Sequence, residues 1–273
     1  MKNKTILILF FLILMTTKSF SLRMVSVGSG VTEIIYALGV QSNLVGNCVS
    51  SNYPKEANNL PKVGYQRMLP SEGIISLNPD VVFITNETGP QSVINQLKNS
   101  GVDILKLRSG RSLEDIYFNI KQISNYLNVS DVGSMLIEKI KSKKANLDSS
   151  INQMQSNPKI LFILGHGGVA RVAGKNTAAD SIIYLSGGEN VVDDFSGYKP
   201  VSPEHFVKLN PDFILTTSMG IDAKGGIEKF SIMPGIRDTK AAKNGNILIF
   251  DAQYLLGFGP RTVEALTELN DNY

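Results

Sequence analysis

The amino-acid sequence predicts an α/β fold of two similar lobes, each with a central, mostly parallel sheet, joined by one long helix and with a ligand cleft between them. Three observations predict this fold: a segment that occurs twice, a long helical pattern between its copies, and an alternation of apolar strands with helices on either side. We therefore expect a first lobe at residues 22–129, a linking helix at 130–156 and a second lobe at 157–273.

The repeated segment occurs once on each side of the predicted linking helix. Residues 72–85 read EGIISLNPDVVFIT, and residues 204–217 read EHFVKLNPDFILTT. Each copy predicts a short helix that stops at Asn-Pro-Asp and is followed by a buried strand. Two copies this far apart indicate two similar lobes, because solenoid repeats recur several times at intervals of about 20 to 50 residues.

The linking helix is predicted from apolar residues that recur every three or four positions across residues 130–155. Lys143 interrupts this stripe, but its stem can lie along an apolar surface. At about 1.5 Å per residue the helix is roughly 40 Å long, which suits a strut between lobes, although composition does not exclude an ordinary surface helix. Ser130 or Asp131 is the expected N-cap. The stripe consists of Val132, Leu136, Ile140, Leu147, Ile151 and Met154.

The remaining pattern places strands and helices in alternation, which is typical of a parallel sheet. In such sheets ligands bind beyond the carboxyl ends of the strands, so the loops of the two lobes should face each other across the cleft. The predicted strands are 24–27, 44–48, 81–85, 103–107, 159–164, 213–217 and 246–251. The predicted helices are 34–38, 90–99, 112–127, 178–185 and 262–270.

Residues 1–21 have the features of a secretory signal peptide: a lysine-bearing start, an apolar run and a small-residue end at Ser19-Phe20-Ser21. The apolar run is short for a membrane span, although an uncleaved N-terminal anchor is the alternative. No cysteine follows the segment, so we expect no lipid anchor. Cleavage would leave about 250 residues, enough for two lobes with their own cores.

Composition excludes several classes of function. Three lysines of the first 21 residues account for the formal net charge of +3, so no basic surface for nucleic acid or an anionic membrane is indicated. The single cysteine, Cys48, allows no internal disulfide and no thiolate metal cluster, and we expect it to be a small buried side chain. With only His166 and His205 the chain lacks the ligands of a zinc or manganese importer.

Three loop segments carry the candidate site residues: 61–67 in the first lobe, and 166–171 and 197–200 in the second. Tyr65 and Arg67 are two positions apart, so in an extended loop their side chains can lie on one side, where the guanidinium would stabilise a phenolate. Tyrosinate and histidine are both known axial ligands of haem iron, and His166 directly follows a predicted strand. The alternative is a rim aromatic at Tyr65 and a hydrogen-bonded loop residue at His166.

At these residues the chain resembles the periplasmic haemin-binding proteins of bacterial ABC importers. The resemblance covers nearly the whole mature chain and rests on PKVGYQR and LPSEGIISLNPD in the first half, and on LGHGGVARVAGKNTAADSIIYLSGGEN and GYKPVSPE in the second. It implies the single-helix-hinge fold of the cobalamin-binding and siderophore-binding proteins. It also implies one or two bound haems, no enzymatic activity, and delivery of haem to a permease dimer with its ATPase subunits.

The resemblance also implies roles for individual residues. Tyr65 matches the family's haem-ligating tyrosine and Arg67 its partner arginine, while His166 matches a histidine that ligates from the opposite lobe in some members. Gly165 stands where a small hydroxyl residue is expected. Arg171 and Tyr198 are further candidates for contact with the ligand.

Two glutamates have an implied role outside the cleft. Glu72 and Glu204 occupy equivalent places at the starts of the repeated helices, where a carboxylate is favoured by the helix dipole. Helix capping alone would explain them. In the resembling family, however, one surface glutamate per lobe docks onto arginines of the permease.

Two other functions compete with haem binding: binding of another iron or cobalt ligand, and hydrolysis. A cobalamin-binding or ferric-siderophore-binding protein of the same fold would look almost the same outside the cleft, although the absence of Trp favours haem mildly. A hydrolase needs a nucleophile and a base held together, and neither Ser29 nor His205 lies in a suitable motif.

Overall fold

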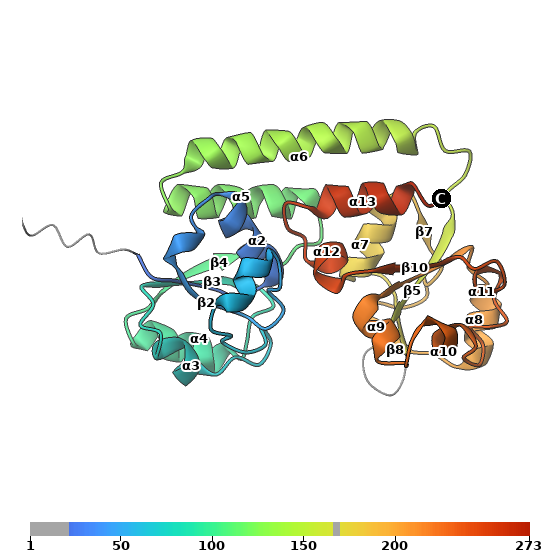
Figure 1. Cartoon of the computed structure of the whole chain (residues 1–273), viewed down its shortest axis with the longest axis horizontal. Coiled ribbons are helices and arrows are strands. Elements are labelled where there is room, and N and C mark those ends of the chain that lie inside the picture. Colours follow the sequence, from blue (N-terminus) through green and yellow to red (C-terminus); the bar gives the residue numbers. More distant parts are fainter. Residues whose placement is uncertain (1–21, 166–169) are drawn as a thin grey trace, which may run out of the picture.

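The computed structural model describes residues 22–165 and 170–273, which form two α/β lobes beneath one long helix (Figure 1). The first lobe has a four-stranded parallel sheet in the order β2-β1-β3-β4. Its strands are β1 (Met24–Ser26), β2 (Leu44–Asn47), β3 (Val81–Thr85) and β4 (Asp103–Leu107). Its helices are α2 (Ser29–Ala37), α3 (Ser71–Ile75), α4 (Gln91–Asn99) and α5 (Leu113–Tyr126), with short 3-10 turns at Gln41–Asn43 and Lys55–Asn59.

The second lobe has a six-stranded mixed sheet, in which β7, β5, β9 and β10 run parallel and β6 and β8 are added antiparallel. Its strands are β5 (Lys159–Leu164), β6 (Arg171–Ala173), β7 (Glu189–Asn190), β8 (Tyr198–Pro200), β9 (Phe213–Thr217) and β10 (Ile247–Phe250). Its helices are α7 (Ala178–Leu185), α8 (Pro203–Leu209), α9 (Ser218–Asp222), α10 (Ile227–Ser231), α11 (Lys240–Lys243), α12 (Ala252–Leu256) and α13 (Thr262–Asn270). The predicted fold class is confirmed, and β6, β7, β8 and α9 to α12 were not predicted.

The repeated segment has the same structure in both lobes. Asn210 caps the end of α8, and Asn78 follows the end of α3 by a few residues; both have the left-handed conformation, with φ of 38° and 43°, which asparagine tolerates better than most residues. Each segment then enters the central strand of its sheet, β3 or β9. The two sheets also match outside the repeated segment. In the first lobe β2 pairs in parallel with β1, and in the second lobe β7 pairs in parallel with β5.

The aspartate of each repeat ties its loop to the first strand of the same lobe. Asp80 Oδ2 accepts a hydrogen bond from the Arg23 amide at 2.7 Å, and Asp212 Oδ2 accepts one from the Lys159 amide at 2.9 Å. Asn-Pro-Asp therefore does more than stop a helix, since its carboxylate fixes where the following strand joins the sheet.

The long helix α6 (Ser130–Ile151) lies along one side of the molecule and packs against α5 and α13 (Figure 1). Ile140 and Leu147 of the predicted stripe are buried in a hydrophobic cluster whose members come from both lobes. Val132, at the start of the stripe, is exposed instead. Each sheet has a second, separate cluster on its other face. The core shared beneath α6 is therefore what joins the lobes by packing.

Both predicted ends of the helix need correction. The N-cap is Val129, without a side-chain cap, because Ser130 is already helical and its hydroxyl donates to Asn125 Oδ1 of α5 at 2.8 Å. The helix ends at Ile151 rather than near residue 156, because the Met154 amide turns back to the Ile151 carbonyl before β5 begins. The lobe limits at 22–129 and 157–273 stay predictions, and residues 1–21 lie outside the described part.

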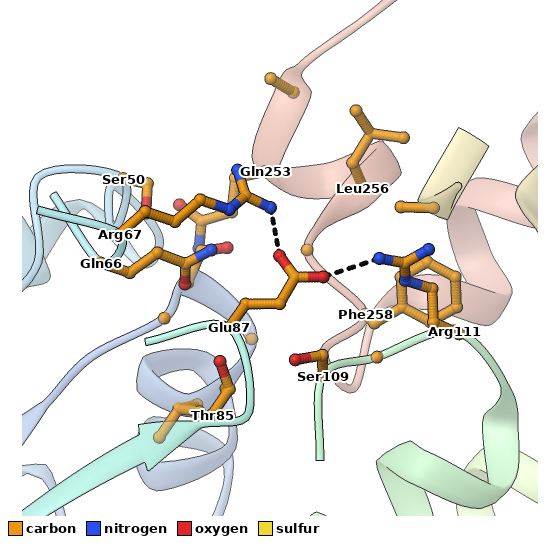
Figure 2. A pocket seen from close by; sticks show the side chains of 18 of the residues that line it. Ser50, Gln66, Arg67, Thr85, Glu87, Ser109, Arg111, Gln253, Leu256 and Phe258 are labelled. Carbon is orange, nitrogen blue, oxygen red and sulfur yellow. Dashed lines mark hydrogen bonds and ion pairs between the residues drawn. The ribbon is translucent and has the colours of Figure 1, made fainter. Parts of the chain in front are cut away.

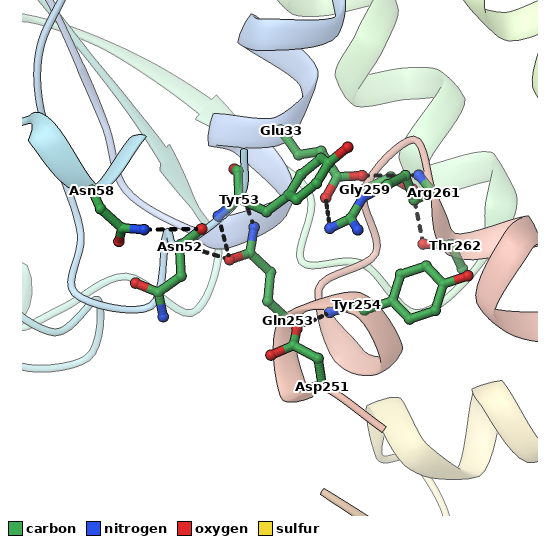
Figure 3. Close-up of polar contacts among 10 residues, drawn as sticks. All are labelled: Glu33, Asn52, Tyr53, Asn58, Asp251, Gln253, Tyr254, Gly259, Arg261 and Thr262. Carbon is green, nitrogen blue, oxygen red and sulfur yellow. Dashed lines mark hydrogen bonds and ion pairs between the residues drawn. The ribbon is translucent and has the colours of Figure 1, made fainter. Parts of the chain in front are cut away.

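Polar contacts fasten the lobes to each other beside this helix (Figure 3). Glu33 of α2 accepts hydrogen bonds from the backbone amide and the Nη2 of Arg261, both at 2.9 Å. The Arg261 guanidinium lies over the Tyr53 ring at 3.2 Å from its centroid. Gln253 Oε1 accepts from the amides of Asn52 and Tyr53 at 2.7 and 3.1 Å.

Close backbone packing completes this junction. A side chain at Gly30 would come within 2.2 Å of the Gly257 carbonyl oxygen, so only glycine lets α2 approach the second lobe here. Cys48 is buried, as expected, and its Sγ accepts from the Gly28 amide at 3.2 Å. In the described ranges, no helix combines the length and apolarity that crossing a membrane requires.

The first prediction tests the packing of α6. Leu147→Ala should lower the free energy of unfolding by about 2 to 5 kcal/mol, because the side chain is only 2% exposed and its loss leaves a cavity. Met135→Ala on the same helix is the matched control, since Met135 is 73% exposed and should change stability by no more than about 0.5 kcal/mol. Urea unfolding measures the stability of both variants. Equal losses of unfolding free energy in the two would contradict the packing of α6 against the shared core.

Candidate functional site

The loop that carries Tyr65 and Arg67 lies at the cleft between the lobes. Tyr65 and Met68 form a single antiparallel bridge, so the loop turns tightly between them. The side chains of Tyr65 and Arg67 lie on the same side of this loop and touch each other. Arg67 Nη1 donates a hydrogen bond to the Tyr65 hydroxyl oxygen at 2.8 Å. The Tyr65 oxygen therefore has a cationic hydrogen-bond donor beside it.

Glu87 and Arg111 extend this contact, and the sequence reasoning missed both (Figure 2). Glu87 follows β3 and forms ion pairs with Arg67 Nη2 through Oε2 and with Arg111 Nη2 through Oε1, the latter at 2.7 Å. Arg111 precedes α5, and its Nη1 donates to the backbone carbonyl of Asn176 in the second lobe. The four side chains and this carbonyl form one continuous set of contacts across the cleft.

The charges in this set hold one another in place. Burial alone would raise the pKa of Glu87, but the hydrogen bonds and charges of Arg111 and Arg67 outweigh it, so the pKa lies below its ordinary value. Burial likewise lowers the pKa of Arg67, and the hydrogen bond and charge of Glu87 reverse that shift. Glu87 is therefore ionised at neutral pH, with a positive group on each side.

The cleft has a volume of about 800 Å³ and is lined by residues from both lobes, at the carboxyl ends of their strands. Its first-lobe wall holds three arginines, Arg67, Arg108 and Arg111, together with the carboxylate of Glu87. Its second-lobe wall holds the apolar side chains of Leu164, Met219, Leu256 and Phe258 beside polar ones such as Asn176, Asp251 and Gln253. A flat ligand with an apolar face and carboxylate groups matches these walls.

Arg108 and Tyr198 occupy defined positions in these walls. Arg108 lies over the Phe118 ring at 4.0 Å and 3.6 Å from an Asp115 carboxylate oxygen. Tyr198 of β8 lies edge-on to Phe162, with ring centroids 6.4 Å apart. Burial raises the pKa of Tyr198, although hydrogen bonds from the Ala179 backbone and the Thr177 side chain act against it. Tyr198 is therefore a neutral hydroxyl at the cleft.

Of the other predicted site residues, Arg171 is not brought into this arrangement. Arg171 begins β6 as an exposed residue, pairs with Leu164 and Pro200 in the sheet, and is absent from the cleft lining. His166 lies outside the described residues. Gly165, just before it, has a packing reason of its own, because a side chain there would come within 2.6 to 2.8 Å of the Gly220 backbone.

Glu72 and Glu204 lie far from the cleft chemistry. Both are exposed in the first turns of α3 and α8, which lie on the side of each lobe away from α6 (Figure 1). A hydrogen bond from the Ser202 side chain lowers the pKa of Glu204. The two carboxylates are thus available to a partner that contacts both lobes at once.

The described residues support neither a hydrolase site nor a site for a bare metal ion. Ser29 begins α2 at the cleft, whereas His205 lies in α8 of the other lobe, so they form no nucleophile and base pair. Across residues 22–165 and 170–273, no three His, Cys, Asp or Glu side chains gather where they could hold a metal ion.

Sequence comparison finds relatives that match over most of this chain. The chain is 28% identical over 261 residues to the uncharacterised ABC transporter substrate-binding lipoprotein YvrC of Bacillus subtilis, covering 94% of this chain and 81% of that protein. It is 28% identical to the vitamin B12-binding protein of Vibrio parahaemolyticus, covering 92% of this chain and 89% of the other.

Solved structures extend the comparison to the fold. The periplasmic heme-binding protein BhuT in complex with two hemes superposes with a TM-score of 0.87 and 34% identity, covering 92% of this chain and 97% of that one. The family described as periplasmic binding protein matches residues 24–254, which is most of the chain. The protein is therefore a member of the periplasmic binding protein family.

Proposed function

We propose that this protein captures haem in the periplasm and delivers it to the permease of an ABC importer. The observation that carries the proposal is the Tyr65 hydroxyl at the cleft with the Arg67 guanidinium 2.8 Å away. Tyrosinate is an axial ligand of haem iron, and an anionic ligand oxygen accepts its strongest hydrogen bonds from a cationic donor such as Arg67. The family consists of binding proteins, and we propose no enzymatic activity for this member.

The walls of the cleft support haem as the cargo. Haem has a flat apolar macrocycle and two propionates, which suit an apolar wall facing three arginines. The cleft volume of about 800 Å³ falls in the range of roughly 300 to 1,000 Å³ typical of ligand pockets. One or two haems are proposed per chain, and a complex with two hemes is known for the similar protein BhuT.

Further residues complete the proposed site. His166 is proposed as a second iron ligand from the opposite lobe, which would let the metal bridge both lobes. Tyr198 is proposed as a ligand contact because it lines the cleft. Arg171 is proposed with less support, since it is exposed and outside the lining.

Cobalamin or a ferric siderophore is the second candidate cargo. The observation in its favour is the similarity to vitamin B12-binding proteins over 92% of the chain. An absorption spectrum of the purified protein, with and without added haemin, separates the two, because haem held by tyrosinate and cobalamin absorb differently.

The second prediction tests the iron ligand. Tyr65→Phe keeps the ring and removes the oxygen, so it should shift the charge-transfer and Soret bands. It should also speed haem loss to an excess of scavenger by more than the roughly 10- to 100-fold that losing an outer-shell partner of a metal site costs. Tyr184→Phe is the matched control, because Tyr184 is 80% exposed on α7 and outside the cleft. An unchanged spectrum and rate in Tyr65→Phe would refute the ligation.

The third prediction tests docking. We propose that Glu72 and Glu204 bind arginines of the permease dimer, one from each lobe. Replacing both by alanine should leave haem binding intact and abolish transport in a reconstituted importer. The matched control replaces Glu114 and Glu228, which are also exposed first-turn glutamates, one per lobe. If transport persists in the Glu72 and Glu204 double variant, these glutamates are only helix caps.

The fourth prediction concerns export. We propose that residues 1–21 are removed near Ser21 and that the mature chain is free in the periplasm without a lipid anchor. Mass spectrometry of the exported protein should then give a mass that starts close to Leu22. A mass that includes Met1, or one that carries a lipid, would contradict this, and the similar YvrC is itself called a lipoprotein.

A further inference from the structure

An unbroken series of polar contacts crosses the cleft from Tyr65 to the second lobe. Arg67 donates to Tyr65 through one Nη and pairs with Glu87 through the other. Arg111 pairs with the second oxygen of Glu87 and donates its other Nη to the carbonyl of Asn176. Glu87 is the middle of the series, because each of its oxygens accepts from a different arginine.

Glu87 is held on a rigid turn. The turn follows β3, and it is closed by the Thr85 amide, which donates to Thr88 Oγ1 at 3.0 Å. The Gly89 amide donates to the Gln66 carbonyl at 2.9 Å, which fastens the turn to the loop of Tyr65 and Arg67. The backbone segments that carry Glu87 and Tyr65 are therefore tied to each other.

The two arginines are not held in this way by packing. Their side chains are 54% and 42% exposed, so each can swing into solvent unless something orients it. A guanidinium is planar, and once one edge pairs with a carboxylate the direction of its remaining donors is set. Pairing with Glu87 therefore points Arg67 at Tyr65 and Arg111 at Asn176.

The far end of the series is equally well defined. Asn176 has a φ of 61°, and its amide donates to Asp180 Oδ2 at 3.0 Å. Its side chain donates to Ser196 Oγ at 3.1 Å. The carbonyl that Arg111 reaches is thus fixed to the second lobe.

We propose that Glu87 is the positioning residue of the cleft: its carboxylate holds Arg67 against the Tyr65 oxygen and Arg111 against the opposite lobe. The inference rests on the proposed function only where it concerns haem, since the placement of both arginines is a property of the ligand-free protein. A simpler role would be that of a nearby negative charge, which would oppose a phenolate at Tyr65. The two roles predict opposite effects on haem retention.

The ligand-free protein tests the placement directly. Guanidinium groups held by a carboxylate give resolved NMR signals from their Nη hydrogens, which can be assigned with Arg67→Lys and Arg111→Lys. We expect both signals in the wild type and in Glu114→Gln, an exposed acid of the same lobe outside the cleft. We expect at least one of them to be lost in Glu87→Gln, because its amide replaces one of the two acceptor oxygens with an NH₂ donor. Retention of both signals in Glu87→Gln overturns the inference, whatever the protein binds.

Haem loss to a scavenger tests the consequence. Glu87→Gln should lose haem about ten-fold faster than the wild type, the lower end of the effect of outer-shell partners, and shift the charge-transfer band. Slower loss would show that Glu87 acts only as a charge and would overturn positioning. Glu87→Asp should recover part of the wild-type rate because it keeps both oxygens, whereas a packing role predicts that the isosteric Gln is the better substitute.

The outcomes separate this inference from the proposed function. If Tyr65→Phe alters the haem spectrum and Glu87→Gln leaves haem loss unchanged, the haem site stands and the role of Glu87 is wrong. If Tyr65→Phe changes nothing, the ligation is wrong, and the arginine signals of the ligand-free protein still decide the role of Glu87.

Discussion

The ion pair between Glu33 and Arg261 is the contact on which the geometry of the cleft depends. Glu33 lies in the first lobe and Arg261 in the second, and the carboxylate is almost fully buried (Figure 3). Removing one partner of a buried pair costs about 3 to 5 kcal/mol, whereas an exposed pair contributes at most about 1 kcal/mol. The Arg261 guanidinium is also covered by the Tyr53 ring, so the pair is shielded from water on that side. The lobes are thus fastened beside α6, and the cleft lies between their free ends.

The fold could be predicted largely from the sequence because its main elements carry strong local signals. The bounds of β5, α7 and α13 match the predicted ones, and the Asn-Pro-Asp repeat correctly indicated two lobes. The elements that were missed are short, such as β6 and β8 with three residues each, and a strand of that length shows no alternation to recognise. The stop of α6 at Ile151 was missed because the apolar spacing continues to Met154, which lies beyond the helix and whose Sδ accepts a hydrogen bond from Asn270 Nδ2.

The candidate site could be predicted only where its residues are neighbours in the sequence. Tyr65 and Arg67 are two positions apart, so a local pattern was enough to pair them. Glu87 is 20 residues from Arg67 and 24 from Arg111 in the sequence. These residues come into contact only because loops that follow parallel strands meet at one edge of the sheet. Gly30 shows the same limit, since the second lobe is what excludes a side chain there and no local pattern indicates that contact.

The contacts that cross the molecule differ in strength in a way that bears on release. Glu33 is buried and Arg261 is 25% exposed, whereas Arg67 and Arg111 are about half exposed and their pairs with Glu87 are screened by water and salt. On the proposed function, a permease that binds Glu72 and Glu204 would act on the lobe ends away from α6. A force applied there would act on the one contact of the Glu87 series that joins the lobes, which is the hydrogen bond from Arg111 to the Asn176 carbonyl. Glu87 and Arg67 would then lose their link to the second lobe while the junction beside α6 stayed closed. Opening at the cleft would thereby release the second lobe from the ligand, while Glu87, Arg67 and Tyr65 keep their contacts within the first lobe.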